Sequence, residues 1–113
     1  MAQGLNRATL IGHLGRAPEM RYTPTGKPVA SFSIVTTHTW SSSDGKRHED
    51  ADWFSVVAWG QLAEQCKHSL HKGQLVYIEG RMKTREWTDA DNRPRSCAEV
   101  VAQDVFTLEP VAS

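Results

Sequence analysis

Apolar and polar side chains alternate along five stretches of this chain, and a period of two residues is the pattern of β-strands with one buried face. The stretches are rich in Val, Ile, Thr and aromatic residues, and clusters of Gly, Pro, Asp and Ser separate them. We predict strands over about 6–14, 29–40, 51–59, 74–87 and 96–108, with a brief extended piece over 20–22. The pattern therefore predicts an all-β domain.

A period of four residues replaces the alternation after Gly60. Leu62, Cys66 and Leu70 recur every four residues, which is the apolar stripe of a short amphipathic helix. Gly73 follows, and we predict that it ends the helix as a left-handed cap. Five strands with one short helix between the third and the fourth is the element order of an OB-fold. The predicted fold class is therefore an all-β, five-stranded OB-fold barrel.

Length and composition fit a single folded domain. The chain has 113 residues, of which 39% are hydrophobic and 23% charged, so we predict one domain over 1–110 and a short end at 111–113. No apolar run approaches the roughly 18 residues that cross a bilayer, and no secretory signal precedes the domain. We therefore expect a cytoplasmic protein with no membrane partner.

The two cysteines, Cys66 and Cys97, are far apart and form no paired motif. We predict that both are small buried apolar side chains, and we expect neither a metal site nor a cofactor. His68 and His71 are three residues apart on the predicted helix but lack a third ligand at motif spacing, so a solvent-facing pair is favoured. No glycine-rich phosphate loop or nucleophile elbow is present, so the chain is not predicted to be an enzyme.

Net charge gives no sign of a nucleic-acid partner, because 13 Lys and Arg residues balance 13 Asp and Glu residues. The distribution of charge is more informative. One parity of the fourth predicted strand holds the residues that we predict as core: Val76, Ile78, Gly80 and Met82. The other parity holds Tyr77, Glu79, Arg81, Lys83, Arg85 and Trp87. Evenly spaced cations beside an indole suit the phosphates and bases of an unpaired strand, although a plain solvated face is the alternative.

The remaining tryptophans belong to the second and third predicted strands. Trp53 and Trp59 share one parity of the third strand, roughly 20 Å apart at the usual strand rise, and either face bases or belong to the core. Trp40 has the parity of Phe32 and Ile34, so we expect a bulge or a strand end to expose it. The flanking polar loops contribute further cations that extend the basic track or only face solvent: Lys46, Arg47, Arg93 and Arg95.

Several longer motifs resemble the bacterial single-stranded-DNA-binding protein family. They are RATLIGHLG at 7–15, DWFSVV at 52–57, WGQLAE at 59–64, KGQLVYIEG at 72–80 and TREWTD at 84–89. The resemblance covers nearly the whole chain in the family's order. It implies an OB-fold that binds and protects single-stranded DNA without sequence preference during replication, recombination and repair. It also implies a cytoplasmic, nucleoid-associated homotetramer.

The resemblance also implies roles for individual residues. Base stacking falls on Trp40, Trp53, Trp59 and Trp87, with Trp59 where relatives often carry Phe. Family phosphate contacts carry over to Arg7, Arg21, Lys72, Lys83, Arg85 and Arg95, and the cationic stripe adds Arg81. This chain has Ser55, Gln61 and Glu86 where some relatives have a cation, which predicts fewer phosphate contacts.

Relatives continue into a flexible linker with an acidic, Phe-terminated tip that recruits replication and repair proteins, whereas this sequence stops at Ser113. A shortened chain and a tail-less member of the family are both consistent with that end, and recruitment is in doubt in either case.

The alternative function is a tail-less primosomal-type adaptor that bridges replication proteins. An adaptor of that kind predicts a dimer with few exposed indoles. A small hydrolase on a barrel scaffold is the other rival, which fold alone does not exclude.

Overall fold

The computed structural model describes residues 4–108, which form six strands and one helix. The strands are β1 (Ala8–Leu14), β2 (Glu19–Tyr22), β3 (Pro28–Ser41), β4 (Arg47–Trp59), β5 (Leu75–Thr88) and β6 (Pro94–Thr107), and the helix α1 covers Gln61–Ser69. Most strand ends lie within two residues of the predicted ones, but β4 begins four residues earlier because the turn before it is short. The domain boundary predicted at residue 110 lies outside the described residues.

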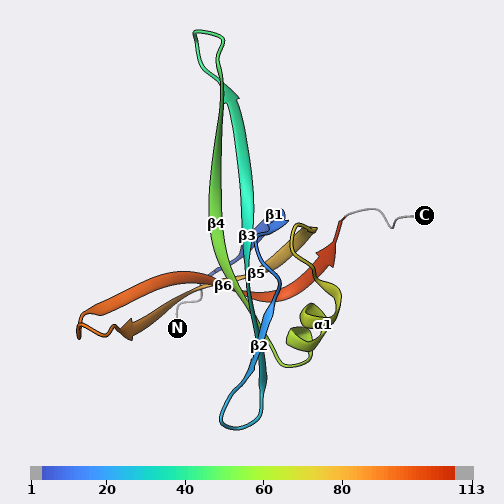
Figure 1. Cartoon of the computed structure of the whole chain (residues 1–113), viewed down its shortest axis with the longest axis vertical. Helices are drawn as coiled ribbons and strands as arrows, with labels where there is room; N and C mark the ends of the chain where they lie inside the picture. The colour runs from blue at the N-terminus through green and yellow to red at the C-terminus, as the bar shows by residue number, and fades with distance from the viewer. Residues whose placement is uncertain (1–3, 109–113) are drawn as a thin grey trace.

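The strands close into a barrel in the order β1-β5-β6-β4-β3, and β1 completes the circle by pairing with β3 through His13↔Val35 and Leu14↔Ile34. All pairs are antiparallel except β4 with β6. Strand β2, the brief extended piece, pairs with the start of β3 as a sixth strand. Helix α1 therefore follows β4 and precedes β5 in the chain, and these are the third and fourth strands of the closed barrel. It packs at one side of the barrel (Figure 1). The predicted fold class is confirmed.

Alternating side chains of the barrel strands fill its interior. The largest fully buried residues are Phe32, Leu14, Ile34, Ile78, Val56, Val76, Val100 and Cys66. Helix α1 adds Ala63 and Cys66 to this core, and burial raises the pKa of the Cys66 thiol to about 11. Cys66 is thus the inert, buried side chain predicted, whereas Cys97 is only half-buried. Among residues 4–108, no helix has the length and apolar character to cross a bilayer.

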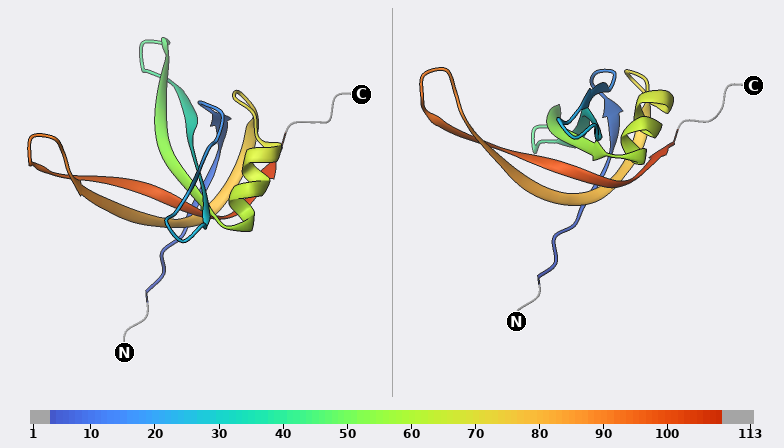
Figure 2. Two further views of the ribbon diagram at one scale, coloured as in Figure 1. Left: turned by 60° about the horizontal axis from the view of Figure 1, so that its bottom comes forward. Right: turned by 90° about the horizontal axis from the view of Figure 1, so that it is seen from below.

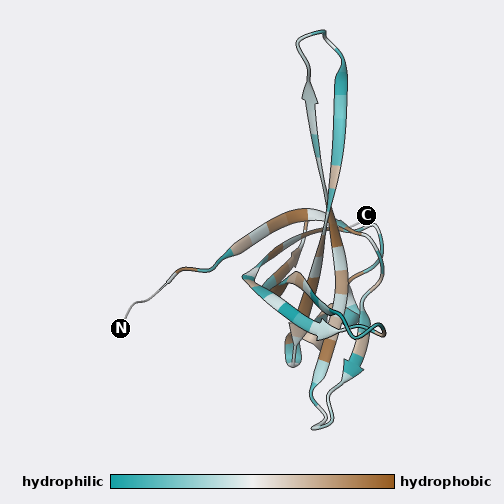
Figure 3. Ribbon diagram, turned by 90° about the vertical axis from the view of Figure 1, so that its left-hand side faces the viewer, coloured by the Kyte–Doolittle hydropathy of each residue, from teal (hydrophilic) through white to brown (hydrophobic). Residues whose placement is uncertain are grey.

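The β3–β4 and β5–β6 hairpins are much longer than the core and project from the barrel in different directions (Figures 1 and 2). We call residues 83–99 the β5–β6 arm and residues 37–51 the β3–β4 hairpin tip. The tip is largely hydrophilic, whereas apolar residues gather in the barrel (Figure 3). Both faces of these projecting ribbons are exposed along most of their length.

This projection corrects one prediction and decides between two alternatives for another residue. Met82 was predicted as core but is 37% exposed, because β1 pairs with β5 only as far as Ala8↔Gly80 and no strand lies beyond it. Of the two explanations expected for Trp40, a bulge is absent, since β3 pairs with β4 in unbroken register as far as Ser41↔Arg47, whereas the strand end is present, one residue after Trp40. Trp40 is exposed because the hairpin has already left the barrel there.

The end of the helix also differs from the prediction. Helix α1 ends at Ser69, and Leu70 is already extended, so Gly73 is not its cap. Gly73 does have a left-handed conformation, with φ +85°, but it uses it in the following turn, where its N–H donates to the carbonyl of Leu14. This hydrogen bond ties the start of β5 to the end of β1.

Truncation of the core tests this packing. Leu14→Ala is expected to lower the free energy of unfolding by about 2–5 kcal/mol, because Leu14 is buried where β1 meets β3 and the loss leaves a cavity. Urea denaturation measures the change. The matched control is Leu5→Ala, at a residue 87% exposed, which should stay within about 0.5 kcal/mol. Equal losses in the two variants would contradict the assigned core.

Candidate nucleic-acid interface

A groove lies between the outer face of β3 and β4 and the near side of the β5–β6 arm. Two adjoining cavities of about 230 and 330 Å³ form it, and they share Arg21, Val57, Arg85 and Glu99. We call this surface the arm groove. Its further charged residues are Arg16 and Glu19, so three cations face two carboxylates and the groove carries a net charge of +1.

Trp59 stands at one end of the arm groove, as the last residue of β4. Its strand partner is Val29, and the Lys27 ammonium group lies 5.5 Å from the centre of the indole ring. A cation over an aromatic face attracts the π-electrons and leaves a positive charge beside the ring. Tyr22 lines the same cavity from β2, so this end offers two aromatic side chains with nearby cations.

Trp53 continues the outer face of β4 beyond the groove, with Ser55 and Val57 between it and Trp59. Its side chain is 63% exposed. The ring lies against Gly15 at the end of β1, where an added Cβ would overlap the indole and the hydroxyl of Ser33. The missing side chain of Gly15 therefore provides the surface on which Trp53 rests.

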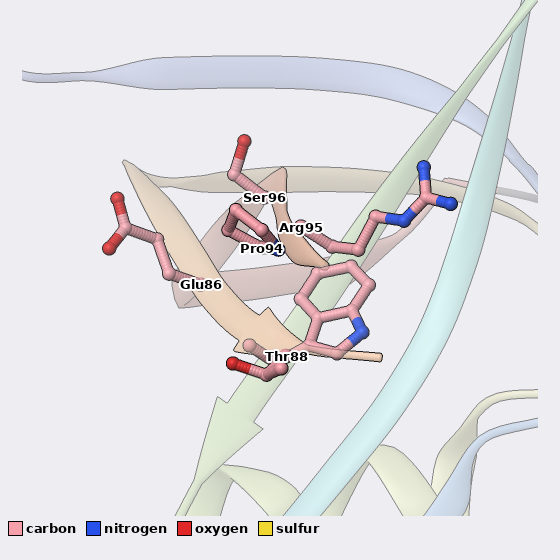
Figure 4. A pocket seen from close by; sticks show the side chains of 6 residues that line it. Glu86, Thr88, Pro94, Arg95 and Ser96 are labelled. Carbon is pink, nitrogen blue, oxygen red and sulfur yellow. The ribbon is translucent and has the colours of Figure 1, made fainter. Parts of the chain in front are cut away.

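Trp87 lies on the β5–β6 arm beside a cavity of about 430 Å³. The Arg85 guanidinium lies 5.2 Å from the centre of its ring. Arg95 is the cross-strand partner of Trp87, and its Nε donates to Oδ2 of Asp89 at 2.8 Å. In Figure 4 the side chains of Glu86 and Arg95 extend to opposite sides, so the carboxylate of Glu86 is turned away from the cationic side.

Trp40 is separate from the arm groove, because it lies on the β3–β4 hairpin tip. Its ring stacks against His38 with 5.7 Å between ring centres, and against His48 with 5.2 Å. All four tryptophans are exposed, which agrees with the predicted outward faces of β4 and β5. Their role in stacking bases stays a prediction.

The predicted phosphate contacts occupy several parts of the surface. Arg21 and Arg85 line the arm groove, and Arg95 lies beside Trp87. Arg81 and Lys83 are exposed on β5, with Val101 and Glu99 as their cross-strand partners. Arg7 precedes β1, and Lys72 is exposed in the turn after α1, and neither lines the arm groove. The site thus gathers three of the seven predicted cations around its rings.

Three residues of the site were missed by the sequence reasoning: Arg16, Tyr22 and Lys27. Strand β2 brings Tyr22 to the groove by pairing with Pro28, and the register of β3 with β4 brings Lys27 beside Trp59. Pro24 and Gly26 stand between β2 and β3 at a spacing that suits a tight turn, which indicates that β2 folds back on β3. The contact with the arm depends on tertiary packing and left no local signal.

Rings at intervals with guanidinium and ammonium groups beside them suit a flexible, unpaired nucleic-acid strand, whose bases stack and whose phosphates need positive charge. A duplex hides its bases and would leave the rings without a partner. The closed barrel and this groove together define an OB-fold protein of the nucleic-acid-binding class.

The chain belongs to the single-strand binding protein family, whose sequence profile matches residues 5–108. It is 44% identical over 109 residues to single-stranded DNA-binding protein 1 of Chlorobaculum tepidum, covering 96% of this chain and 67% of that protein. It is 41% identical over 104 residues to the single-stranded DNA-binding protein of Neisseria meningitidis serogroup A, covering 92% and 60%. The chain therefore spans about two thirds or less of the length of these relatives.

A solved structure described as a Plasmodium falciparum SSB complex with ssDNA has a TM-score of 0.87 to this fold, with 27% sequence identity. The match covers 96% of this chain and 99% of that one. The resemblance drawn from the sequence motifs is thus confirmed at the level of family and fold.

The turn of the arm gives a pH-dependent test. The hydrogen bond from Arg95, and then that from the Arg93 backbone, hold the pKa of Asp89 below its ordinary value of 3.8. Ionised Asp89 therefore stabilises the turn above its ordinary pKa, and this stabilisation is lost as pH falls through the lowered value. Carboxyl NMR should show Asp89 titrating below 3.8, and Arg95→Gln should move the midpoint upward. An unchanged midpoint in Arg95→Gln would show that the ion pair does not hold this turn.

Proposed function

We propose that this chain binds and protects single-stranded DNA without sequence preference, through the barrel domain predicted over 1–110. The observation that carries the proposal is the set of exposed indoles around the arm groove: Trp59 lines it with Arg21 and Arg85, Trp87 lies beside Arg85, and Trp53 continues the outer face of β4 beyond it. Membership of the single-strand binding protein family and the likeness to a complex with ssDNA support it.

The two kinds of side chain do different work. Any base can stack on an indole, because every base has a π-face. Stacking therefore contributes affinity without sequence preference. Arg21 and Arg85 attract phosphates, which makes binding depend on salt and speeds association. We therefore assign base stacking to the four tryptophans, and phosphate contact first to Arg21, Arg85 and Arg95. The function is binding and needs no catalytic step.

The biological setting follows from this activity. A protein that coats unpaired DNA serves replication, recombination and repair, and we place its action in the cytoplasm at the nucleoid. Recruitment of other proteins is not assigned to residues 4–108. The exposed indoles weigh against the adaptor alternative, which has no use for base-stacking side chains.

Titration with oligo-dT tests the function. Trp emission should be quenched at low salt, and duplex DNA of equal length should bind poorly. Trp53→Ala and Trp87→Ala should each weaken binding by about 1–3 kcal/mol, roughly 5- to 150-fold, a scale established on proteins of this same class rather than derived from this structure. The matched variants Trp53→Phe and Trp87→Phe keep a ring and should retain most of the affinity.

The salt dependence isolates the charge contribution. Arg21→Gln and Arg85→Gln should each flatten the slope of log K against log salt by about 0.7, the value for one phosphate on a single strand. A protein that fails to quench with oligo-dT at low salt, or that binds duplex DNA equally well, would overturn the proposed function.

We further propose that the chain assembles with copies of itself into a homotetramer. The supporting observation is an apolar face across β1, β5 and β6, where Ile11, Tyr77 and Phe106 pair side by side. Ile11 and Phe106 are 55% and 57% exposed, and the rings of Tyr77 and Phe106 lie 6.0 Å apart. An exposed apolar patch of this kind on a sheet is a surface suited to a protein contact.

Sedimentation velocity tests the assembly. The unaltered chain should sediment as a tetramer, and Phe106→Glu should dissociate it, because a carboxylate on the apolar face would lose its water on assembly. Met82→Glu changes an exposed apolar residue outside that face and should leave the tetramer intact. A monomer of the unaltered chain, or equal dissociation by both variants, would contradict the proposed interface.

A further inference from the structure

The β3–β4 hairpin tip carries a row of three stacked rings. His38 lies two residues before Trp40 on β3, and His48 is the cross-strand partner of Trp40 on β4. The imidazole planes lie within 19° and 23° of the indole plane, with 5.7 and 5.2 Å between ring centres. The Trp40 indole therefore lies against two imidazoles. We call these three side chains the hairpin platform.

The charges around the hairpin platform differ from those of the arm groove. On the same face of the ribbon, His38 pairs with Asp50, and Asp52 follows opposite Thr36. Arg47 and Glu49 belong to the opposite face, opposite Ser41 and Thr39. With both histidines neutral, the platform face therefore carries two carboxylates and no cation.

The turn between β3 and β4 adds one carboxylate, Asp44, and one cation, Lys46. Lys46 donates its backbone N–H to Asp44, whose carboxylate also accepts from the Ser42 hydroxyl. Nε2 of His48 lies 3.1 Å from the same hydroxyl. These hydrogen bonds hold the His48 ring in place. The Ser42 hydroxyl lies between that ring and the Asp44 carboxylate. The turn thus adds no net positive charge.

We propose that His38, Trp40 and His48 form a second contact for single-stranded DNA, whose hold on phosphates is switched on by protonation of the two imidazoles. The inference rests on the proposed function and deepens it. Histidine is the side chain whose charge changes between pH 5 and 8. At the upper end of that range Asp50 and Asp52 repel the phosphates. At the lower end two imidazolium groups offset the two carboxylates, and both lie against the Trp40 indole.

The arm groove supplies an internal reference, because its cations Arg16, Arg21 and Arg85 stay charged throughout this range. Binding through the groove therefore persists at pH 8, and only the hairpin contribution varies with pH. At lower pH the same protein engages more phosphates and a longer stretch of DNA.

Salt titrations with oligo-dT at about pH 5.5 and pH 8 test the proposal, because thymine carries no group that titrates in this range. In the unaltered protein the slope of log K against log salt should steepen by up to about 1.4 at the lower pH, which is 0.7 for each of two phosphates. Calorimetry near pH 6.5, in buffers of different ionisation enthalpy, should show up to about one proton taken up per chain on binding, because ordinary imidazoles are already about half protonated there.

The double variant His38→Gln/His48→Gln should lose both the steepening of the slope at the lower pH and the proton uptake. Its matched control is His68→Gln/His71→Gln, which removes two exposed histidines at and after the end of α1 and should keep both effects. If the hairpin double variant fails to fold, the single variant His48→Gln should lose half of each effect.

Two outcomes overturn the inference: a slope that is the same at both pH values in the unaltered protein, or a pH effect that survives in the hairpin double variant. Failure of the proposed function has a different result, since it would abolish binding of oligo-dT at pH 8 as well.

Discussion

The surface of this protein depends on where its barrel core ends. Thirteen- and fourteen-residue strands enclose a core that uses only part of their length, and closure rests on two pairs between β1 and β3. Beyond the core each hairpin keeps its ladder hydrogen bonds but has no apolar cover. Large rings on those ribbons are consequently exposed without any cost to the core, which is already filled by Phe32, Ile34 and Val56.

Strand periodicity predicts the orientation of a side chain. Particular residues show how far that orientation also predicts burial. Val76, Ile78 and Gly80 are buried as their parity predicts, and Trp53, Trp59 and Trp87 are exposed. The prediction is wrong at Met82, because alternation says which side a residue faces but not whether anything covers that side. Coverage is a tertiary property that a single strand does not encode.

The candidate site was predictable to the same extent. Indoles and alternating cations are local signals, so the four tryptophans and Arg85 were found from the sequence and the family motifs. Arg16, Tyr22 and Lys27 join them through the pairing of β2 with β3 and through the curvature of the arm. Neither the pairing partner of a four-residue strand nor the bend of a long ribbon is fixed by its own residues.

The contact between Gly15 and Trp53 has a thermodynamic consequence. A side chain that must be immobilised when a ligand arrives costs about 0.5–1.5 kcal/mol of conformational entropy, which is subtracted from affinity. Trp53 rests on bare backbone at Gly15, so folding has already restricted its rotamers even though most of its surface is open to solvent. For the base stacking proposed at Trp53, the ordering penalty would therefore fall on the flexible nucleic acid and not on the protein.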